Sequence, residues 1–259
     1  MIFDFTGKVA LVTGGESGIG ACIAKELSRL GCAIIITYFT KLELAEKVLA
    51  DVNENGHRNL IINCDVRDEG SVSNLFYQAK NTFGKIDFLI NSAGIRSYDK
   101  PVTELSFSDF KNTIETNLFG VFLCTKYFIN QDEQFRDGRI INITSIHQEI
   151  VSAGKTDYCA SKFGVNGFSK ALALEVAEKN VTVNCIAPGM VLTPMNEKAV
   201  DDFEYRAEQE KRIPLQHAAH PIEVANMTVF LCSPQAKYIT GTTQIIDGGL
   251  SLNRSKGSK

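Results

Sequence analysis

Two side chains with acid/base chemistry, Tyr158 and Lys162, stand four residues apart in a stretch with the apolar spacing of a helix. Residues four apart lie on one face of a helix, so the lysine ammonium group is expected beside the phenol. An ordinary phenol has a pKa near ~10, and bringing it near 7 needs roughly 4 kcal/mol of stabilisation of the charged form. A neighbouring cation supplies part of that. Taken alone, such a pair is more often a core tyrosine and a surface lysine.

A hydroxyl that could work with this pair belongs to Ser145, which follows the apolar run Ile140–Ile143 and precedes Tyr158 by thirteen residues. Parallel-sheet enzymes place ligand-facing residues just past the ends of their strands. Ser145 is therefore expected to hold a substrate oxygen next to the phenol.

A glycine-rich segment, Thr13-Gly-Gly-Glu-Ser-Gly-Ile-Gly20, follows an apolar run and opens a helical pattern. Gly14 and Gly18 permit a tight turn and Gly20 permits close helix packing, which leaves the helix N-terminus open for a pyrophosphate. Such turns also occur for purely structural reasons, but this one begins an alternating chain, where a nucleotide-binding half would start. No Gly-Lys-Ser/Thr follows, so a phosphate-hydrolysing P-loop is not indicated.

The elements that must position these residues are short, β-branched strands alternating with helices. Short strands that are apolar on both faces predict a mostly parallel sheet covered on both sides, a single-domain Rossmann-type α/β fold of about seven strands. The predicted strands are Val9–Val12, Ala33–Thr37, Leu60–Cys64, Phe88–Ile90, Ile140–Ile143, Val181–Ile186 and Gln244–Ile246.

The helices are predicted from apolar spacing. Ile19, Ile23, Leu27 and Leu30 recur at helical intervals after the glycine loop. Longer patterns cover Ser108–Asn130 and Tyr158–Lys179. The stretch from Gly189 to about Pro221 lacks a strand signal, and its charged middle, Asp201 to Arg212, predicts a surface helix in a lid over the site. One domain is expected over residues 1–250, followed by a polar tail over 251–259.

Composition excludes several classes of protein. Apolar residues make up 44% and charged residues 22% of the 259 residues, and the net charge of −3 gives no attraction to nucleic acid or anionic lipid. Seven dispersed cysteines without a C-x-x-C pair fit a reducing cytoplasm. Neither a signal peptide nor a membrane span is indicated. His217 and His220 lack a third ligand, so no metal is expected.

Together these residues resemble the short-chain dehydrogenase/reductase family over essentially the whole chain. The matching elements are Thr13-Gly-x-x-x-Gly-x-Gly20, Asp65, Asn91-x-Ala-Gly94, Asn117, Ser145, Tyr158-x-x-x-Lys162, Pro188-Gly189 with Thr193, and Asp247-Gly-Gly249. One departure is Ser92, where the family usually has a second asparagine.

The resemblance implies a role for each matching residue. Tyr158 is the general acid/base, Ser145 orients the substrate oxygen, and Lys162 holds the cofactor ribose and lowers the tyrosine pKa. Asn117 supports a water-borne proton relay. The cofactor-binding residues expected are Thr13, Gly14, Ser17, Gly18, Ile19, Gly20, Tyr38, Lys41, Asp65, Val66, Asn91, Ala93, Gly94, Tyr158, Lys162, Pro188, Gly189 and Thr193. Asp65 meets the adenine, and Thr193 holds the nicotinamide carboxamide.

The second strand favours NADP over NAD as cofactor. Where NAD-specific relatives carry an aspartate for the ribose hydroxyls, this chain has Tyr38, so nothing acidic there repels a 2′-phosphate. Lys41 is the nearest cation that would pair with that phosphate, and Glu16 in the glycine loop would oppose it. We expect NADP to be preferred, with NAD use also open.

Substrate identity stays open between three hypotheses. Ser145-Ile-His147 and the tyrosine after the second strand resemble the glucose 1-dehydrogenase branch, in which His147 would bond a sugar hydroxyl. Arg96 instead suits an anionic partner, as in a 3-oxoacyl-carrier-protein reductase. An inactive NADP-binding sensor or scaffold is the third. By resemblance, the helices over Ser108–Asn130 and Tyr158–Lys179 pair between subunits of a homotetramer.

Overall fold

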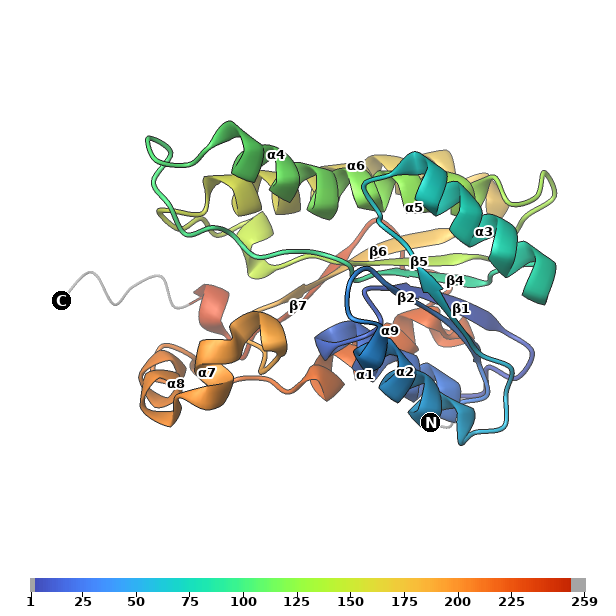
Figure 1. The fold of residues 1–259 in the computed structure, drawn as a ribbon, viewed down its shortest axis with the longest axis horizontal. Coiled ribbons are helices and arrows are strands. Elements are labelled where there is room, and N and C mark those ends of the chain that lie inside the picture. The colour runs from blue at the N-terminus through green and yellow to red at the C-terminus, as the bar shows by residue number, and fades with distance from the viewer. Residues whose placement is uncertain (1–2, 253–259) are drawn as a thin grey trace.

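The computed structural model describes residues 3–252, in which one sheet of seven parallel strands forms the centre of the molecule (Figure 1). The strand order is β3-β2-β1-β4-β5-β6-β7, which is the Rossmann-type doubly wound arrangement. Each strand lies within two residues of its predicted bounds, so the predicted fold is confirmed. The strands are β1 (Val9–Thr13), β2 (Ala33–Tyr38), β3 (Leu60–Asn63), β4 (Phe88–Asn91), β5 (Arg139–Ile143), β6 (Thr182–Pro188) and β7 (Thr243–Ile246).

Helices cover both faces of this sheet (Figure 1). One layer holds α1 (Gly18–Arg29), α2 (Leu42–Asn53) and α9 (Pro221–Cys232). The other holds α3 (Glu69–Phe83), α5 (Gly120–Ile129) and α6 (Thr156–Glu175), with α4 (Phe107–Ile114) packed against α6. This two-sided cover explains why the strands are apolar on both faces.

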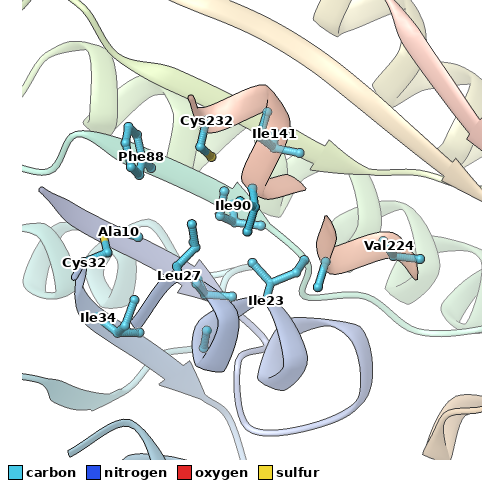
Figure 2. Close-up of a cluster of buried hydrophobic side chains, with 14 of the residues drawn as sticks. Ala10, Ile23, Leu27, Cys32, Ile34, Phe88, Ile90, Ile141, Val224 and Cys232 are labelled. Atoms are coloured by element: carbon cyan, nitrogen blue, oxygen red, sulfur yellow. The ribbon is translucent and has the colours of Figure 1, made fainter. Parts of the chain in front are cut away.

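The core between α1, α9 and the sheet is built from the residues that the helical spacing singled out. Ile23 and Leu27 of α1 are fully buried against Ile34, Ile90 and Val224, which come from β2, β4 and α9 (Figure 2). Burying one such side chain contributes roughly 1.5–3 kcal/mol. A second cluster, containing Leu75 and Phe128, fills the space on the opposite face. Both layers therefore hold the strand ends in fixed positions.

The helical segment predicted over Ser108–Asn130 is present, but it is not a regular α-helix throughout. The chain forms α4, then a π-helical turn over Glu115–Phe119, and then α5. A π turn adds one residue to the helical repeat, and such turns are frequent at functional sites. Asn117 lies in this turn and is fully buried. The turn therefore displaces Asn117 from the register that a regular α-helix would give it.

The segment between β6 and α9 contains no strand, as predicted. The surface helix predicted over Asp201 to Arg212 is α8 (Phe203–Glu210), and a further short helix, α7 (Glu197–Asp201), precedes it. They lie beyond the carboxyl ends of the strands (Figure 1). Of the expected polar tail, Ser251 and Leu252 belong to a short 3-10 turn that begins at Leu250. The rest of that tail lies outside the described residues.

Candidate active site

The strand order reverses between β1 and β4, which makes this the topological switch point of the sheet. From β1 the chain proceeds outward to β2 and β3, and then returns to β4 on the other side of β1. In open α/β sheets, ligands bind at such a switch point, outside the carboxyl ends of the strands. The glycine loop follows β1 and the Asn91-x-Ala-Gly94 motif follows β4, so both border this point.

The glycine loop has the backbone geometry of a dinucleotide cradle. Gly14 and Gly18 adopt φ of +61° and +53°, a region that side chains rarely allow. A Cβ on Gly14 would lie 2.8 Å from Ala93 Cα, and one on Gly20 would meet the carbonyl oxygen of Gly14. Ser17 is the N-cap of α1, and its side chain makes no capping bond. The first amides of α1 therefore remain available for an anion.

Hydrogen bonds tie the glycine loop to both neighbouring strands. Thr13 Oγ1 accepts from the backbone N–H groups of Ser92 at 3.0 Å and Ala93 at 3.1 Å. On the other side, Gly14 N–H donates to Thr37 Oγ1 at 3.2 Å, and Gly15 N–H donates to the Thr37 carbonyl at 3.1 Å. The Thr13 side chain thus holds the loop in place, which leaves its backbone for the cofactor.

The structure brings Ser145, Tyr158 and Lys162 together as predicted. Ser145 is the second residue after β5, and the other two project from the first two turns of α6. Lys162 Nζ lies 5.5 Å from the centroid of the Tyr158 ring and donates to the Ile143 carbonyl at 3.1 Å. Because Ile143 ends β5, Lys162 also joins α6 to the strand that carries Ser145.

Burial controls the acid/base properties of this group. It raises the pKa of the Tyr158 phenol to about 12, and a hydrogen bond with the Ser145 side chain opposes part of this rise. Burial also lowers the pKa of Lys162 to about 8, because a charged ammonium loses hydration in the interior. The chain's own groups therefore keep Tyr158 protonated near neutral pH. That Lys162 lowers the tyrosine pKa stays a prediction.

The Asn117 side chain clamps the loop that follows β4. Its Oδ1 accepts from Ile95 N–H at 2.8 Å, and its Nδ2 donates to the Ile95 carbonyl at 3.0 Å and to Ser161 Oγ at 3.2 Å. A Cβ on Gly94 would lie 3.2 Å from Asn117 Oδ1 and 3.9 Å from Lys162 Nζ. The amide of Asn117 is thus engaged by Ile95 and Ser161, and the part in a proton relay that the resemblance implies stays a prediction.

A buried carboxylate beside Tyr158 was missed from the sequence. Asp157 is fully buried, and its two oxygens accept from Ser97 Oγ at 2.7 Å and Thr113 Oγ1 at 2.9 Å. It links the loop after β4 and α4 to the first turn of α6. An acidic residue in the first turn of a helix is an ordinary pattern. Its partners are 60 and 44 residues away in sequence, so no local signal revealed them.

The Asn91 side chain points into the interior. Its Nδ2 donates to Asn142 Oδ1 at 2.8 Å and to Thr125 Oγ1 at 3.3 Å, and Asn142 in turn donates to Ser169 Oγ at 2.8 Å. This buried chain of polar groups joins β4, β5 and α6 beneath the site. The Asn91 amide is therefore engaged in the interior, and a place for this residue in the cofactor channel stays a prediction.

After β3, where the cofactor adenine was expected, Asp65 has partners that the sequence did not predict. Asp65 accepts from the Arg67 guanidinium at 2.7 and 2.9 Å, and this interaction lowers the pKa of Asp65. Arg67 also lies over the ring of Phe39, 5.2 Å from its centroid. Val66 is buried against Gly120 at the start of α5. Arg67 and Phe39 were not predicted, because their proximity depends on the pairing of β2 with β3.

Tyr38 and Lys41 lie where the sequence places them, at the end of β2 and at the N-cap of α2. Tyr38 is half-buried and Lys41 is exposed. The end of β2 thus carries a phenol, and a cation follows three residues later.

The segment predicted to form a lid, from Gly189 to about Pro221, begins against the glycine loop. Thr193 is buried, and a Cβ on Gly18 would lie 3.3 Å from Thr193 Cβ. Gly189 packs so closely on Asp247 that a Cβ there would lie 2.8 Å from Asp247 Cβ. Asp247 accepts from Gly249 N–H at 2.8 Å and Ser251 N–H at 2.6 Å. The closing Asp-Gly-Gly motif therefore anchors the end of the sheet behind Pro188-Gly189.

Of the two candidate substrate residues, His147 lies nearer the phenol. Its ring meets the Tyr158 ring edge to face, with centroids 6.0 Å apart, and its Nδ1 lies 2.8 Å from the Ile150 carbonyl. Because a carbonyl only accepts, Nδ1 carries the hydrogen and the neutral ring keeps Nε2 as an acceptor. Arg96 is 68% exposed and lies 3.9 Å from Asp99.

Between residues 3 and 252, no three His, Cys, Asp or Glu side chains are grouped so as to hold a metal ion. Over those residues, every helix is too short or too polar to span a bilayer.

Comparison with known proteins decides the family. A family model described as enoyl-(acyl carrier protein) reductase matches residues 14–251. The chain is 40% identical over 247 residues to the 3-oxoacyl-acyl-carrier-protein reductase FabG of Haemophilus influenzae, covering 95% of this chain and 99% of that protein. The chain belongs to the short-chain dehydrogenase/reductase family. It is an NAD(P)-dependent oxidoreductase, as the sequence predicted.

Two further relatives of this short-chain dehydrogenase/reductase bear on its specificity. Glucose 1-dehydrogenase 2 of Bacillus subtilis is 33% identical over 257 residues, with 99% of each chain covered. The crystal structure of an actinorhodin polyketide ketoreductase variant with NADPH superimposes with a TM-score of 0.88 at 33% identity, covering 94% of this chain and 97% of that one. These relatives act on different substrates, so the family does not identify the substrate here.

Proposed function

We propose that this chain moves a hydride between NADP and a hydroxyl or carbonyl carbon of a small molecule, with Tyr158 as general acid/base. The observation that supports this most is the placement of Ser145, Tyr158 and Lys162 around one point at the carboxyl edge of the sheet. Each of the three is held by the fold through α6 and β5.

In this proposal the chain's own groups handle the proton and orient the substrate. The nicotinamide, when bound, supplies or accepts the hydride. Ser145 Oγ holds the substrate oxygen, and Tyr158 donates its proton to that oxygen during reduction and removes it during oxidation. The raised pKa of Tyr158 suits the reductive direction, because the phenol stays protonated at neutral pH. Lys162 provides positive charge beside the phenol.

The preference for NADP rests on the end of β2. With Tyr38 at the strand end, no carboxylate repels a 2′-phosphate there. The Lys41 ammonium stands at the N-cap of the following helix. The NADPH-bound neighbour and the FabG relative are consistent with this choice. The glycine cradle fits the pyrophosphate of either cofactor, since Gly14, Gly18 and Gly20 leave no room for side chains there.

A sugar is the substrate that the site supports best. His147 lies beside Tyr158 in a tautomer whose Nε2 accepts a hydrogen bond, and a polyol offers a hydroxyl donor next to the reacting carbon. The likeness to glucose 1-dehydrogenase 2 points the same way.

A 3-oxoacyl-carrier-protein reductase is the second candidate, favoured by one observation. Arg96 is exposed on the loop after β4, and Asp99, to which it lies 3.9 Å away, is also held by Lys155 at 2.7 Å. A cation presented in this way suits an anionic partner. The FabG relative is consistent with this alternative.

A panel of substrates assayed with both cofactors distinguishes these activities. Oxidation of glucose supports the sugar enzyme, and reduction of an acetoacetyl thioester supports the carrier-protein enzyme. Nucleotide binding without turnover of any alcohol or carbonyl would instead indicate an inactive sensor or scaffold and would overturn the proposal.

We also propose a cytoplasmic homotetramer. Phe119, Phe122 and Phe163 are exposed on the outer surface of α5, α6 and the π turn between α4 and α5, where a second copy would cover them. All seven cysteines are free thiols, six of them buried, which suits a reducing compartment.

A further inference from the structure

Glu16 in the glycine loop lies against the end of β2. Gly15, its neighbour, donates to the Thr37 carbonyl at 3.1 Å, and Gly14 donates to Thr37 Oγ1 at 3.2 Å. Thr37 is the residue before Tyr38. Since dinucleotide folds place the adenosine ribose at this strand end, Glu16 borders the ribose position.

One oxygen of the Glu16 carboxylate lacks a hydrogen-bond donor. Its Oε2 is buried and has no hydrogen-bond partner among residues 3–252. Burial raises the pKa of Glu16, and this rise is opposed by a hydrogen bond from the residue's own backbone and, to a smaller extent, by the ammonium of Lys41. A buried carboxylate oxygen without a donor costs free energy, so a ligand hydroxyl that donates to it is favoured. The ribose of NAD carries such a hydroxyl at its 2′ position, whereas that of NADP carries a phosphate.

We propose that Glu16 is a specificity-determining residue for the cofactor: its carboxylate accepts from the adenosine ribose hydroxyl and repels a 2′-phosphate, in opposition to Lys41. This rests on the proposed function, because it needs a dinucleotide in the cradle. Glu16 reduces the preference for NADP over NAD that Tyr38 and Lys41 provide. The chain is therefore built to accept both cofactors rather than to exclude NAD.

The test is direct binding of NAD⁺ and NADP⁺ by titration calorimetry, with no substrate present. Glu16→Gln keeps the size of the side chain and removes its charge, so NADP⁺ binding should tighten about tenfold, or ~1.4 kcal/mol. NAD⁺ affinity should change less than threefold. Lys41→Met should weaken NADP⁺ binding about tenfold. The double variant should return close to the wild-type ratio of the two dissociation constants.

A matched control is Glu43→Gln, which removes an exposed carboxylate from the first turn of α2. It should leave that ratio within twofold, and thermal unfolding confirms that each variant is folded. A ratio unchanged within twofold in Glu16→Gln, with both cofactors still bound, overturns this inference alone. Failure of the folded wild-type chain to bind either dinucleotide overturns the proposed function instead.

Discussion

Lys162 stands over the ring of Tyr158, with Nζ 5.5 Å from the ring centroid, and is held there by the Ile143 carbonyl. The interior disfavours the charge on this lysine, which lowers its pKa to about 8. Near neutral pH a large fraction of Lys162 is nonetheless protonated. The site therefore keeps a cation where it costs stability.

Lys162→Met should consequently stabilise the fold while removing activity. From the lowered pKa, the charged lysine costs a few kcal/mol, and the lost bond to Ile143 offsets part of this, so a net gain of about 1–2 kcal/mol is expected. Urea unfolding at pH 7 measures it. Lys170→Met, at an exposed position of the same helix, is the control and should change stability by less than about 0.5 kcal/mol.

The same substitution makes a prediction about pH. Because the folded pKa of Lys162 lies below its ordinary 10.5, the unfolded chain binds more protons between pH 8 and 10.5. The Lys162 contribution to wild-type stability therefore rises with pH over that window. The gain in unfolding free energy that Lys162→Met gives over the wild type should therefore shrink from pH 8 upward. An advantage that is constant or grows with pH would contradict the account of Lys162 as a buried cation.

Asp157 should stabilise the fold through the hydroxyl groups that donate hydrogen bonds to it. Asp157→Ala removes two buried hydrogen bonds to a carboxylate and leaves Ser97 Oγ and Thr113 Oγ1 only the carbonyls of Gly154 and Asp109 as acceptors, so a loss of about 3 kcal/mol is expected. Asp157→Asn keeps one carbonyl oxygen, and a hydroxyl can turn to accept from the amide, so it should cost less than half as much. Equal losses in the two variants, measured by urea unfolding, would show that the carboxylate's hydrogen bonds are not the cause.

The exposed phenylalanines on α5 and α6 predict how the subunits associate. Phe122→Glu combined with Phe163→Glu places charges on the proposed interface and should convert the tetramer to smaller species in sedimentation experiments. Phe203→Glu, on exposed α8, is the control and should leave the assembly intact. A wild-type chain that sediments as a monomer would refute the proposed tetramer outright.

The sequence predicted the sheet well because its strands are buried on both faces. Such strands appear as short, unbroken apolar runs, so only their ends were misjudged, as at Thr13 and Asn91, where polar residues continue the ladder. The grouping of Ser145 with Tyr158 and Lys162 also followed, because strand ends and helix faces are local properties. Their chemical roles came from resemblance to a family.

What the sequence did not reveal depends on distant partners. The apolar spacing of the helix around Asn117 gave no sign of its π turn. The hydrogen-bond partner of the Asn117 amide is the backbone of Ile95, which is 22 residues away. The sequence already set Glu16 against Lys41, but the burial of Glu16 and its oxygen without a partner became visible only in the packed structure. Contacts of this kind arise from packing and have no local pattern.

The most direct test of the account is the effect of Tyr158→Phe on turnover and on cofactor binding. With the best substrate of the panel, kcat/KM should fall by about a thousandfold, since general acid/base groups contribute 10²–10⁴-fold. The dissociation constant for NADP⁺ should stay within threefold, because the fold and the glycine cradle are unchanged. A variant that keeps the wild-type rate would show that Tyr158 is not the acid/base.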